Sequence, residues 1–165
     1  MYETPQEALR AIEALGLPKA VTDVWNDAGP TRFRRQYRAP VRYFTMADDL
    51  LSRNPSADHY IPIFEVNGEK LYAFDTRAGK FVEYYYEDET ATAIGADYQQ
   101  FIGWIFVDLG YAGLDSIVDE VADLFEFKSM PKLREFMEQD DESSAADAKR
   151  EFVDGLGREI RRVVR

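Results

Sequence analysis

The central stretch of the sequence predicts a β-hairpin. It reads Tyr60-Ile61-Pro62-Ile63-Phe64-Glu65-Val66, then Asn67-Gly68, then Glu69-Lys70-Leu71-Tyr72-Ala73-Phe74-Asp75. Two apolar runs joined by Asn-Gly are typical of a two-residue type I′ turn, because both turn residues need a positive φ. Such a turn predicts the pairs Val66–Glu69, Glu65–Lys70, Phe64–Leu71 and Ile63–Tyr72. The second of these pairs places opposite charges across from each other, which favours this register.

Both faces of the predicted hairpin are apolar. One face carries Ile61, Ile63, Tyr72 and Phe74, and the other carries Pro62, Phe64, Val66, Leu71 and Ala73. A sheet with one solvated face alternates apolar and polar residues, so we expect other elements to cover both sides of this hairpin. After a turn at residues 77–80, residues 81–86 predict a third strand, and residues 91–94 a short fourth strand.

Helices are predicted on either side of these strands in the sequence. Thr4-Pro5-Gln6-Glu7 has the spacing of a capping box, a second helix opens at Leu17-Pro18, and Thr45-Met46-Ala47-Asp48 predicts another helix start. Apolar residues at helical spacing predict further helices over 96–109, from residue 114, after Pro131 and at the C-terminal end. We expect the helices from residue 96 onwards to lie against the sheet or against one another.

Taken together, these elements indicate an α+β protein with a mainly antiparallel sheet of about four strands or more. Helices pack around the sheet, and residues 113–165 form a helical C-terminal extension. A chain of 165 residues can bury roughly 68–70% of its unfolded surface, so we expect a single domain over residues 1–165.

Composition excludes several classes of site. The chain has no cysteine and one histidine, His59, which excludes disulfides, a thiol nucleophile and a two-histidine metal site within the chain. Its net charge of −11 argues against general affinity for nucleic acid or anionic membranes. The N-terminal residues lack the pattern of a secretory signal, and no apolar run reaches the roughly 18–20 residues of a membrane helix, so we expect a cytoplasmic protein.

Enzyme motifs are absent from the sequence. It contains neither a Gly-rich phosphate loop nor a Gly-x-Ser-x-Gly elbow, and we interpret His59 as a surface or strand-edge side chain. The acidic runs 87–89 and 140–142 lack the alternating ligands and central glycine of a calcium loop. We therefore expect no catalytic residue, no metal site and no cofactor.

The third strand and the acidic run after it suggest a partner-binding site. The candidate residues are Tyr85, Glu87, Asp88 and Glu89. If Glu83 marks the more open face of the strand, Tyr85 is an aromatic side chain beside an acidic loop, a frequent composition at protein interfaces. Packing of Tyr85 under a helix is an equally good interpretation.

Five arginines cluster in an irregular or edge strand over residues 32–42: Arg32, Arg34, Arg35, Arg38 and Arg42. Pro40 favours an edge position because proline has no N–H for a strand ladder. The cluster could bind a phosphate or an acidic partner through bidentate contacts. We favour an internal role, either in capping sheet edges or in neutralising residues 113–147, which carry a net charge of −8.

A series of short motifs follows one order along residues 17–109: Leu17-Pro18, Val24-Trp25-Asn26, Gly29, Tyr60-Ile61-Pro62-Ile63, Tyr72-Ala73-Phe74-Asp75, Gly79-Lys80-Phe81-Val82-Glu83-Tyr84 and Tyr98-Gln99-Gln100-Phe101-Ile102. This order resembles the SUKH superfamily, the Smi/Knr-like proteins. The arginine-rich stretch, the Asn67-Gly68 hairpin and the long helical extension depart from the family pattern.

The resemblance implies an α+β core over residues 17–109 and a function in binding proteins without catalysis. Bacterial members of the family are regarded as immunity proteins that neutralise toxins, often nucleases, and fungal members as signalling scaffolds. The expected partner is therefore a protein, in the bacterial case a basic toxin domain that an acidic surface would attract. Two other hypotheses remain open: an acidic nucleic-acid mimic or anti-defence inhibitor, and a small metal-dependent hydrolase.

Overall fold

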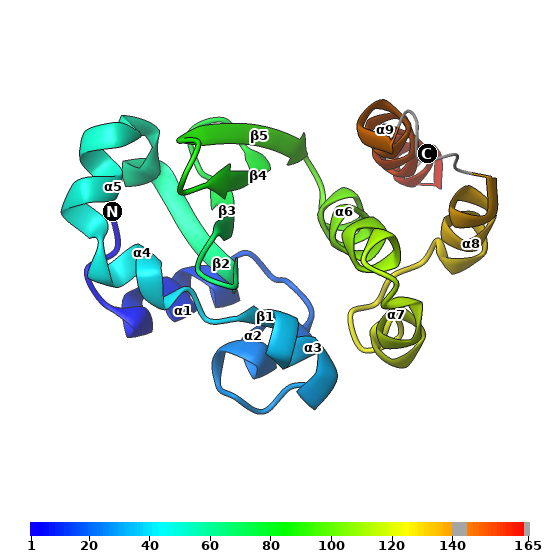
Figure 1. Ribbon diagram of the computed structural model, residues 1–165, viewed down its shortest axis with the longest axis horizontal. Coiled ribbons are helices and arrows are strands. Elements are labelled where there is room, and N and C mark those ends of the chain that lie inside the picture. The colour runs from blue at the N-terminus through cyan, green and yellow to red at the C-terminus, as the bar shows by residue number, and fades with distance from the viewer. Residues whose placement is uncertain (140–144, 164–165) are drawn as a thin grey trace. The chain divides into compact units, whose positions relative to one another are not determined.

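The computed structural model describes residues 1–139 and 145–163 and contains two compact units, Met1–Ala93 and Ile94–Arg165 (Figure 1). The predicted α+β class is confirmed, since helices accompany a five-stranded sheet whose consecutive strands β1 to β4 pair antiparallel. The boundary between the units falls within the last strand, so the helix that begins at Tyr98 belongs to the second unit.

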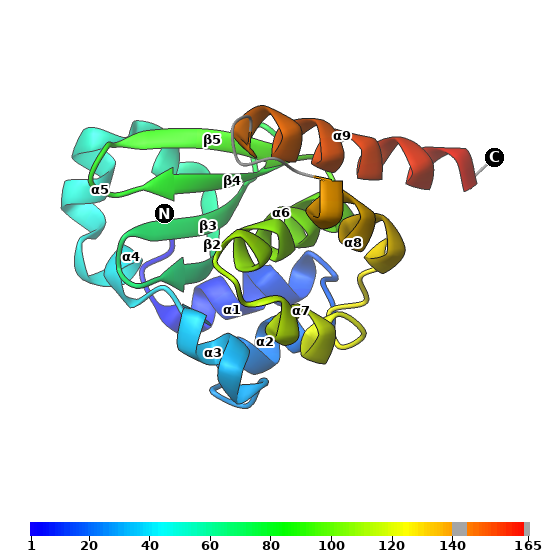
Figure 2. The same cartoon turned by 45° about the vertical axis from the view of Figure 1, so that its right-hand side comes forward.

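The strands follow one another across the sheet in the order β1-β2-β3-β4-β5, and Figure 2 shows β2 to β5 side by side. Their bounds are β1 (Tyr37–Arg38), β2 (Tyr60–Val66), β3 (Lys70–Asp75), β4 (Lys80–Tyr85) and β5 (Thr90–Gly95). The helices before them are α1 (Pro5–Ala14), α2 (Lys19–Trp25), α3 (Thr31–Gln36), α4 (Val41–Thr45), α5 (Ala47–Arg53) and the 3₁₀ helix η1 (Pro55–His59).

The hairpin turn is as predicted, but its register is not. Asn67 and Gly68 have φ values of 52° and 72°, and the Glu69 N–H donates to the Val66 carbonyl over 2.9 Å, which confirms the type I′ turn. However, Val66 lies opposite Lys70, so all four predicted pairs are wrong by one residue. The Glu69 carbonyl accepts instead from the N–H of Tyr86, over 3.0 Å, and this hydrogen bond directs Glu69 toward the other side of the hairpin.

An irregularity between Pro62 and Phe64 restores the register that the turn alone would give. Beyond it Pro62 lies opposite Ala73, whereas Phe64 lies opposite Tyr72. One extra residue moves a side chain to the opposite face of a strand. Phe64 therefore shares the face of Tyr72 and not, as predicted, that of Leu71.

The prediction of an irregular or edge strand over residues 32–42 is mostly wrong. Only β1 is a strand, at the edge of the sheet, and it lies between two short helices, α3 and α4. Pro40 precedes the first turn of α4, where a missing N–H costs nothing, and does not lie within a strand. The helix predicted to start near Thr45 begins at Ala47, because Thr45 closes α4.

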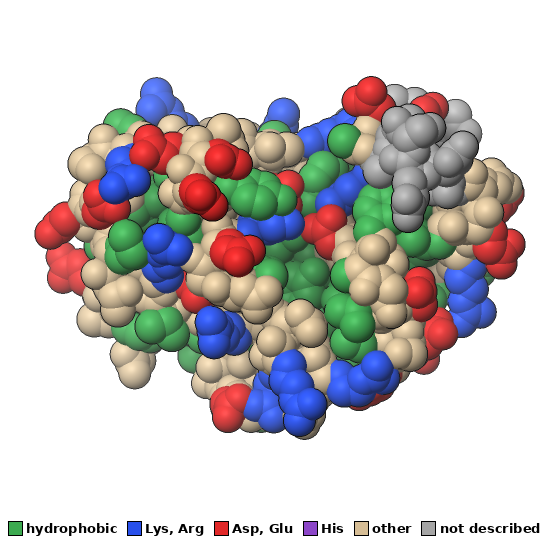
Figure 3. Space-filling view, viewed as in Figure 1, with side chains coloured by type: hydrophobic (Ala, Val, Ile, Leu, Met, Phe, Trp, Pro, Cys, Tyr) green, Lys and Arg blue, Asp and Glu red, His purple; other side chains and the backbone are tan. Residues whose placement is uncertain are grey.

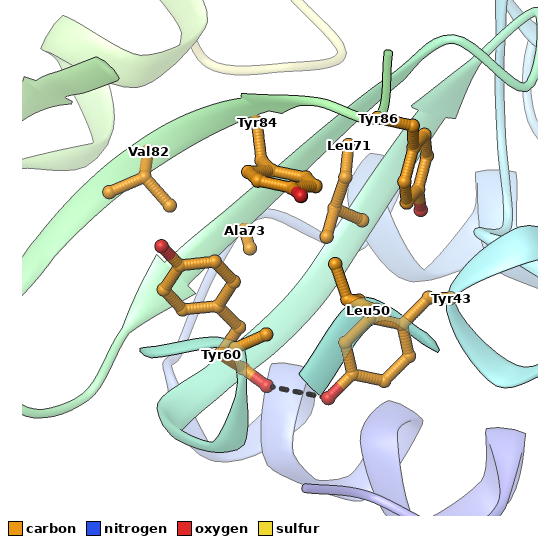
Figure 4. Close-up of a cluster of buried hydrophobic side chains, with 9 residues drawn as sticks. Tyr43, Leu50, Tyr60, Leu71, Ala73, Val82, Tyr84 and Tyr86 are labelled. Carbon is orange, nitrogen blue, oxygen red and sulfur yellow. Dashed lines mark hydrogen bonds between the residues drawn. The ribbon is translucent and has the colours of Figure 1, made fainter. Parts of the chain in front are cut away.

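Side chains from both the helices and the strands bury one face of the first unit's sheet (Figure 4). Tyr43, Leu50 and Ala57 come from α4, α5 and η1, and they pack with Tyr60, Leu71, Ala73, Val82, Tyr84 and Tyr86. The Tyr43 hydroxyl donates to the Tyr60 carbonyl over 3.3 Å, as the dashed line in Figure 4 marks. This cluster confirms the expected cover on the Leu71 face of the hairpin.

An aromatic cluster lies on the Tyr72 face. Phe33 stacks on Tyr37 at 4.7 Å between ring centroids, and Tyr37 in turn contacts both Phe64 and Tyr72. These four rings are 0–3% exposed, so α3 and β1 contribute cover to this second face. The apolar character of both hairpin faces therefore predicted their burial correctly.

The second unit consists of helices around α6 (Tyr98–Tyr111), namely α7 (Asp115–Val121), α8 (Met130–Gln139) and α9 (Ala145–Val163) (Figure 1). A capping box between Asp97 and Gln100 starts α6, which contacts the other three helices. The predicted packing of these helices on one another is confirmed. The helix predicted from residue 114 ends earlier than its apolar pattern suggests, and Leu124 beyond it is 54% exposed.

Candidate functional site

The acidic candidate residues lie in the turn between β4 and β5. Glu87, Asp88 and Glu89 are all exposed, and Glu89 adopts a positive φ of 56°. Arg53 of α5 forms ion pairs with Glu89 at 3.0 Å and with Asp49 at 2.9 Å. Acidic and basic side chains are interspersed over α5 and the neighbouring strands in Figure 3. Because Arg53 offsets the charge of Glu89, Glu87 and Asp88 carry the net negative charge of this turn.

Tyr85 is half-buried at the end of β4, next to this turn. The premise that Glu83 marks an open face of the strand is wrong, since Glu83 is only 5% exposed. The ammonium group of Lys70 lies 4.9 Å from the centroid of the Tyr85 ring, a cation–π distance. Tyr85 thus extends from a buried polar cluster toward the acidic turn.

That buried polar cluster centres on Lys70 of β3. Its Nζ lies 3.2 Å from Glu83 Oε2 and donates to the Tyr72 hydroxyl over 3.2 Å. Removing one member of a buried ion pair leaves the other charge without compensation, so such a pair holds its strands in register. The predicted charge pair of Lys70 with Glu65 is replaced by this pair with Glu83. The sequence contained a signal for this cluster. Residues two apart on a strand share a face, so Lys70 lies on the same face as Tyr72, and Glu83 on the same face as Tyr85.

Glu65 has partners of its own in the arginine-rich stretch. Its carboxylate is 2% exposed and accepts from the backbone N–H of Arg42 over 2.8 Å, while the Arg38 Nε lies 3.9 Å away. This pairing ties β1 and the start of α4 to β2. The edge-capping role favoured for the arginines therefore fits Arg38, and it fits Arg42 because the Arg42 guanidinium donates to the Gly68 carbonyl in the hairpin turn.

The remaining arginines of the stretch lie on α3. Arg34 donates to the Gly29 carbonyl over 2.7 Å and pairs with Asp27, so it closes the loop before its own helix. Arg32 and Arg35 are exposed on the same short helix. The five side chains are thus divided among α3, β1 and α4.

A small cavity of about 70 Å³ lies beside Arg42, Arg53, Tyr84 and Tyr86. The Tyr86 hydroxyl is buried and has no hydrogen-bond partner among the described residues, and the Arg42 guanidinium covers its ring at 4.7 Å. Burial raises the pKa of Tyr86 well above its ordinary value. This volume accommodates about two water molecules, and nothing in the sequence marked the site.

The described part of the chain, residues 1–139 and 145–163, contains no group of three or more His, Asp or Glu side chains that could hold a metal ion. The acidic run Asp140-Asp141-Glu142 lies outside the described residues. His59 is half-buried at the end of η1, where its carbonyl accepts from the Thr76 N–H over 3.0 Å. Within these same ranges no helix is long and apolar enough to cross a membrane.

Comparisons with known proteins found no match to this chain among protein-family models, curated proteins or solved structures. The resemblance to the SUKH superfamily accordingly rests on the short motifs of residues 17–109 alone.

Proposed function

We propose that this chain is a non-catalytic protein-binding module that neutralises a basic toxin domain, in the manner of the immunity proteins that its motifs resemble. The observation that carries the proposal is the turn between β4 and β5. There Glu87 and Asp88 are exposed beside the half-buried ring of Tyr85. An aromatic anchor next to a charged rim is the usual composition of a site that binds another protein.

Buried side chains of the sheet hold this turn in place. Tyr84 and Tyr86 flank Tyr85 in the sequence and are buried in the core cluster, and Lys70 contacts the Tyr85 ring from β3. A binding residue held by buried neighbours loses little conformational entropy when a partner binds. The net charge of −11 supports a basic partner in particular, since complementary charge speeds diffusional encounter.

The experiment that tests this function begins with a candidate basic toxin domain recovered by pull-down from the native host. Toxicity of that domain is measured in cells with and without this chain, and binding is measured by surface plasmon resonance at low and at high salt. We expect protection of the cells and an association rate that falls as salt rises, because salt screens exposed charges over about 8 Å at physiological ionic strength. Tight binding that leaves toxicity unchanged would contradict neutralisation.

A further inference from the structure

A second pocket lies within the helical unit, between α6, α7 and α8, and has a volume of about 190 Å³. Its floor is apolar and consists of Phe106, Val118, Leu133, Met130 and Met137. The first three are buried and the two methionines are half-buried, so the methionines form the part of the floor nearest to solvent. A cavity of about 150 Å³ lined by apolar side chains holds a benzene molecule, so this pocket has room for one apolar side chain.

The rim of this pocket is acidic. Asp115 and Asp119 of α7 and Glu138 of α8 are exposed around its mouth. The one basic rim residue, Arg134, is bound to Asp119 at 2.9 Å. Residues 113–139 of the sequence carry seven acidic and three basic side chains, so the rim belongs to a wider region of negative charge.

Methionine and carboxylate together select one class of occupant. The thioether side chain is flexible and polarizable, and it adapts to apolar side chains of different shapes. The carboxylates favour lysine or arginine and repel an acidic segment. A small uncharged ligand would use the floor but not the rim, and another predominantly acidic surface would be repelled by the rim.

We propose that this pocket docks a basic segment of a protein partner, which inserts one apolar side chain against Met130 and Met137 while its lysines or arginines pair with Asp115 and Glu138. The proposal rests on the proposed function, because it assigns a second contact to the same basic partner. It extends that function to a surface that the β4–β5 turn does not include.

The four methionines of the chain allow a direct test by NMR of the protein labelled with ¹³C at the methionine methyl groups. Met130 and Met137 report on the pocket, and Met1 in the first unit serves as the internal control. Met46 lines the cavity beside Arg53, the partner of Glu89, and so reports on the neighbourhood of the β4–β5 turn. The probe is a synthetic lysine- and arginine-rich peptide with one central leucine. Two matched peptides carry glycine in place of the leucine, or glutamate in place of the basic residues.

We expect the leucine peptide to shift the Met130 and Met137 signals and to leave Met1 unmoved. The glycine peptide should bind about ten-fold or more weakly, because burial of a leucine side chain supplies that much affinity. The glutamate peptide should produce no shift. Asp115→Asn and Glu138→Gln combined should weaken binding several-fold and reduce its dependence on salt. Asp119 is left unchanged because it pairs with Arg134.

The matched control combines Asp123→Asn and Asp154→Asn, which removes the same charge at exposed positions outside the pocket lining. Equal weakening by the control and the rim variant would overturn the proposal, as would equal affinity for the leucine and glycine peptides. Shifts of Met130 and Met137 on raising the protein concentration alone would assign the pocket to a second copy of this chain. Peptide shifts at Met46 alone would overturn the pocket proposal and leave the proposed function standing. Failure to protect cells from the toxin domain would contradict the proposed function, whatever the pocket binds.

Discussion

The indole N–H of Trp25 donates a hydrogen bond to the carbonyl of Ile63 over 2.6 Å. Ile63 is the residue at which the register of β2 and β3 shifts, between Pro62 and Phe64. Because Pro62 lacks an N–H and Ile63 lies between two registers, the strand ladder is locally incomplete, and the Trp25 side chain from α2 satisfies the Ile63 carbonyl. The ring of Trp25 also packs edge-on against Phe44 at 6.2 Å.

Replacing Trp25 by phenylalanine should remove the hydrogen bond while keeping an aromatic ring next to Phe44. We expect the free energy of unfolding to fall by about 1 kcal/mol or more, because the Ile63 carbonyl then loses its partner in a partly buried place. Urea denaturation of the two proteins measures the difference. Phe44→Leu is the companion variant, since it disturbs the ring contact and leaves the hydrogen bond intact. A Trp25→Phe protein as stable as the original would show that the bond contributes nothing.

The hairpin illustrates which features the sequence could predict. Asn67 and Gly68 determine the turn locally, because few residues tolerate consecutive positive φ values, and the turn was predicted correctly. The register depends on the hydrogen bond between Glu69 and Tyr86, which are 17 positions apart in the chain. No local pattern contains that information.

Gly68 should resist substitution for reasons of backbone conformation alone. A side chain at this position would meet nothing closer than Glu65 Oε1 at 4.0 Å, but φ is 72°. Gly68→Val should therefore lower the free energy of unfolding by at least about 1–2 kcal/mol, the cost of the left-handed region for a residue with a Cβ. Thermal unfolding followed by circular dichroism measures this change. An unaltered melting temperature would mean that the turn rearranges without cost.

Two glycines of α9 should respond in opposite ways to replacement by alanine. At Gly157 a Cβ would lie 2.5 Å from Gln100 Nε2, and Gln100 is held by hydrogen bonds to Ala96 and to the Val153 carbonyl. At Gly155 a Cβ would meet no atom within 4 Å. We expect Gly155→Ala to stabilise the protein by about 0.5–1 kcal/mol, as alanine does within a helix.

Gly157→Ala should instead destabilise it, because the α6–α9 contact has to open. The two variants control for each other, since they make the same substitution in the same helix. Chemical denaturation of both measures the comparison. If both stabilise the protein equally, helix propensity outweighs the close approach of Gln100.

The arginine-rich segment and the Lys70 cluster show why the candidate sites were harder to predict than the fold. Pro40 is compatible both with an edge strand and with the start of a helix. In the structure the helix start also carries a tertiary hydrogen bond, from the Arg42 N–H to Glu65. Glu83 looked like a surface residue because glutamate is rarely buried. Glu83 is buried because Lys70 lies beside it and compensates its charge. Lys70 belongs to another strand, so the sequence of β4 alone does not reveal this neighbour.

Removing a tyrosine hydroxyl should have opposite effects at two positions of the core cluster. The Tyr86 hydroxyl is buried without a partner among the described residues, whereas the Tyr43 hydroxyl donates to the Tyr60 carbonyl over 3.3 Å. Tyr86→Phe should leave stability unchanged or raise it by about 1 kcal/mol, and Tyr43→Phe should lower it by about 1 kcal/mol. Urea denaturation of both variants gives the comparison. A loss of stability in Tyr86→Phe would indicate that water molecules in the adjacent cavity bind this hydroxyl.

The β4–β5 turn offers the most direct test of binding to a basic partner. Glu87→Lys combined with Asp88→Lys should chiefly lower the association rate, because these exposed carboxylates attract the partner before contact. Glu89 is left unchanged because it pairs with Arg53 at 3.0 Å, and its reversal would disturb α5 as well. Tyr85→Ala should chiefly raise the dissociation rate. The ring is half-buried in the free protein and becomes fully buried only in the complex, so it stabilises the complex once formed.

The matched control for this pair is Glu3→Lys with Glu13→Lys, which changes the net charge equally at exposed positions of the same unit. We expect it to slow association less than the turn variant does, and we expect the difference to vanish at high salt, where exposed charges are screened. Surface plasmon resonance with the recovered basic domain gives both rates separately. If both charge variants slow association equally, the net charge of the whole protein attracts the partner. If neither the turn variant nor Tyr85→Ala alters either rate, the partner contacts another surface of the chain.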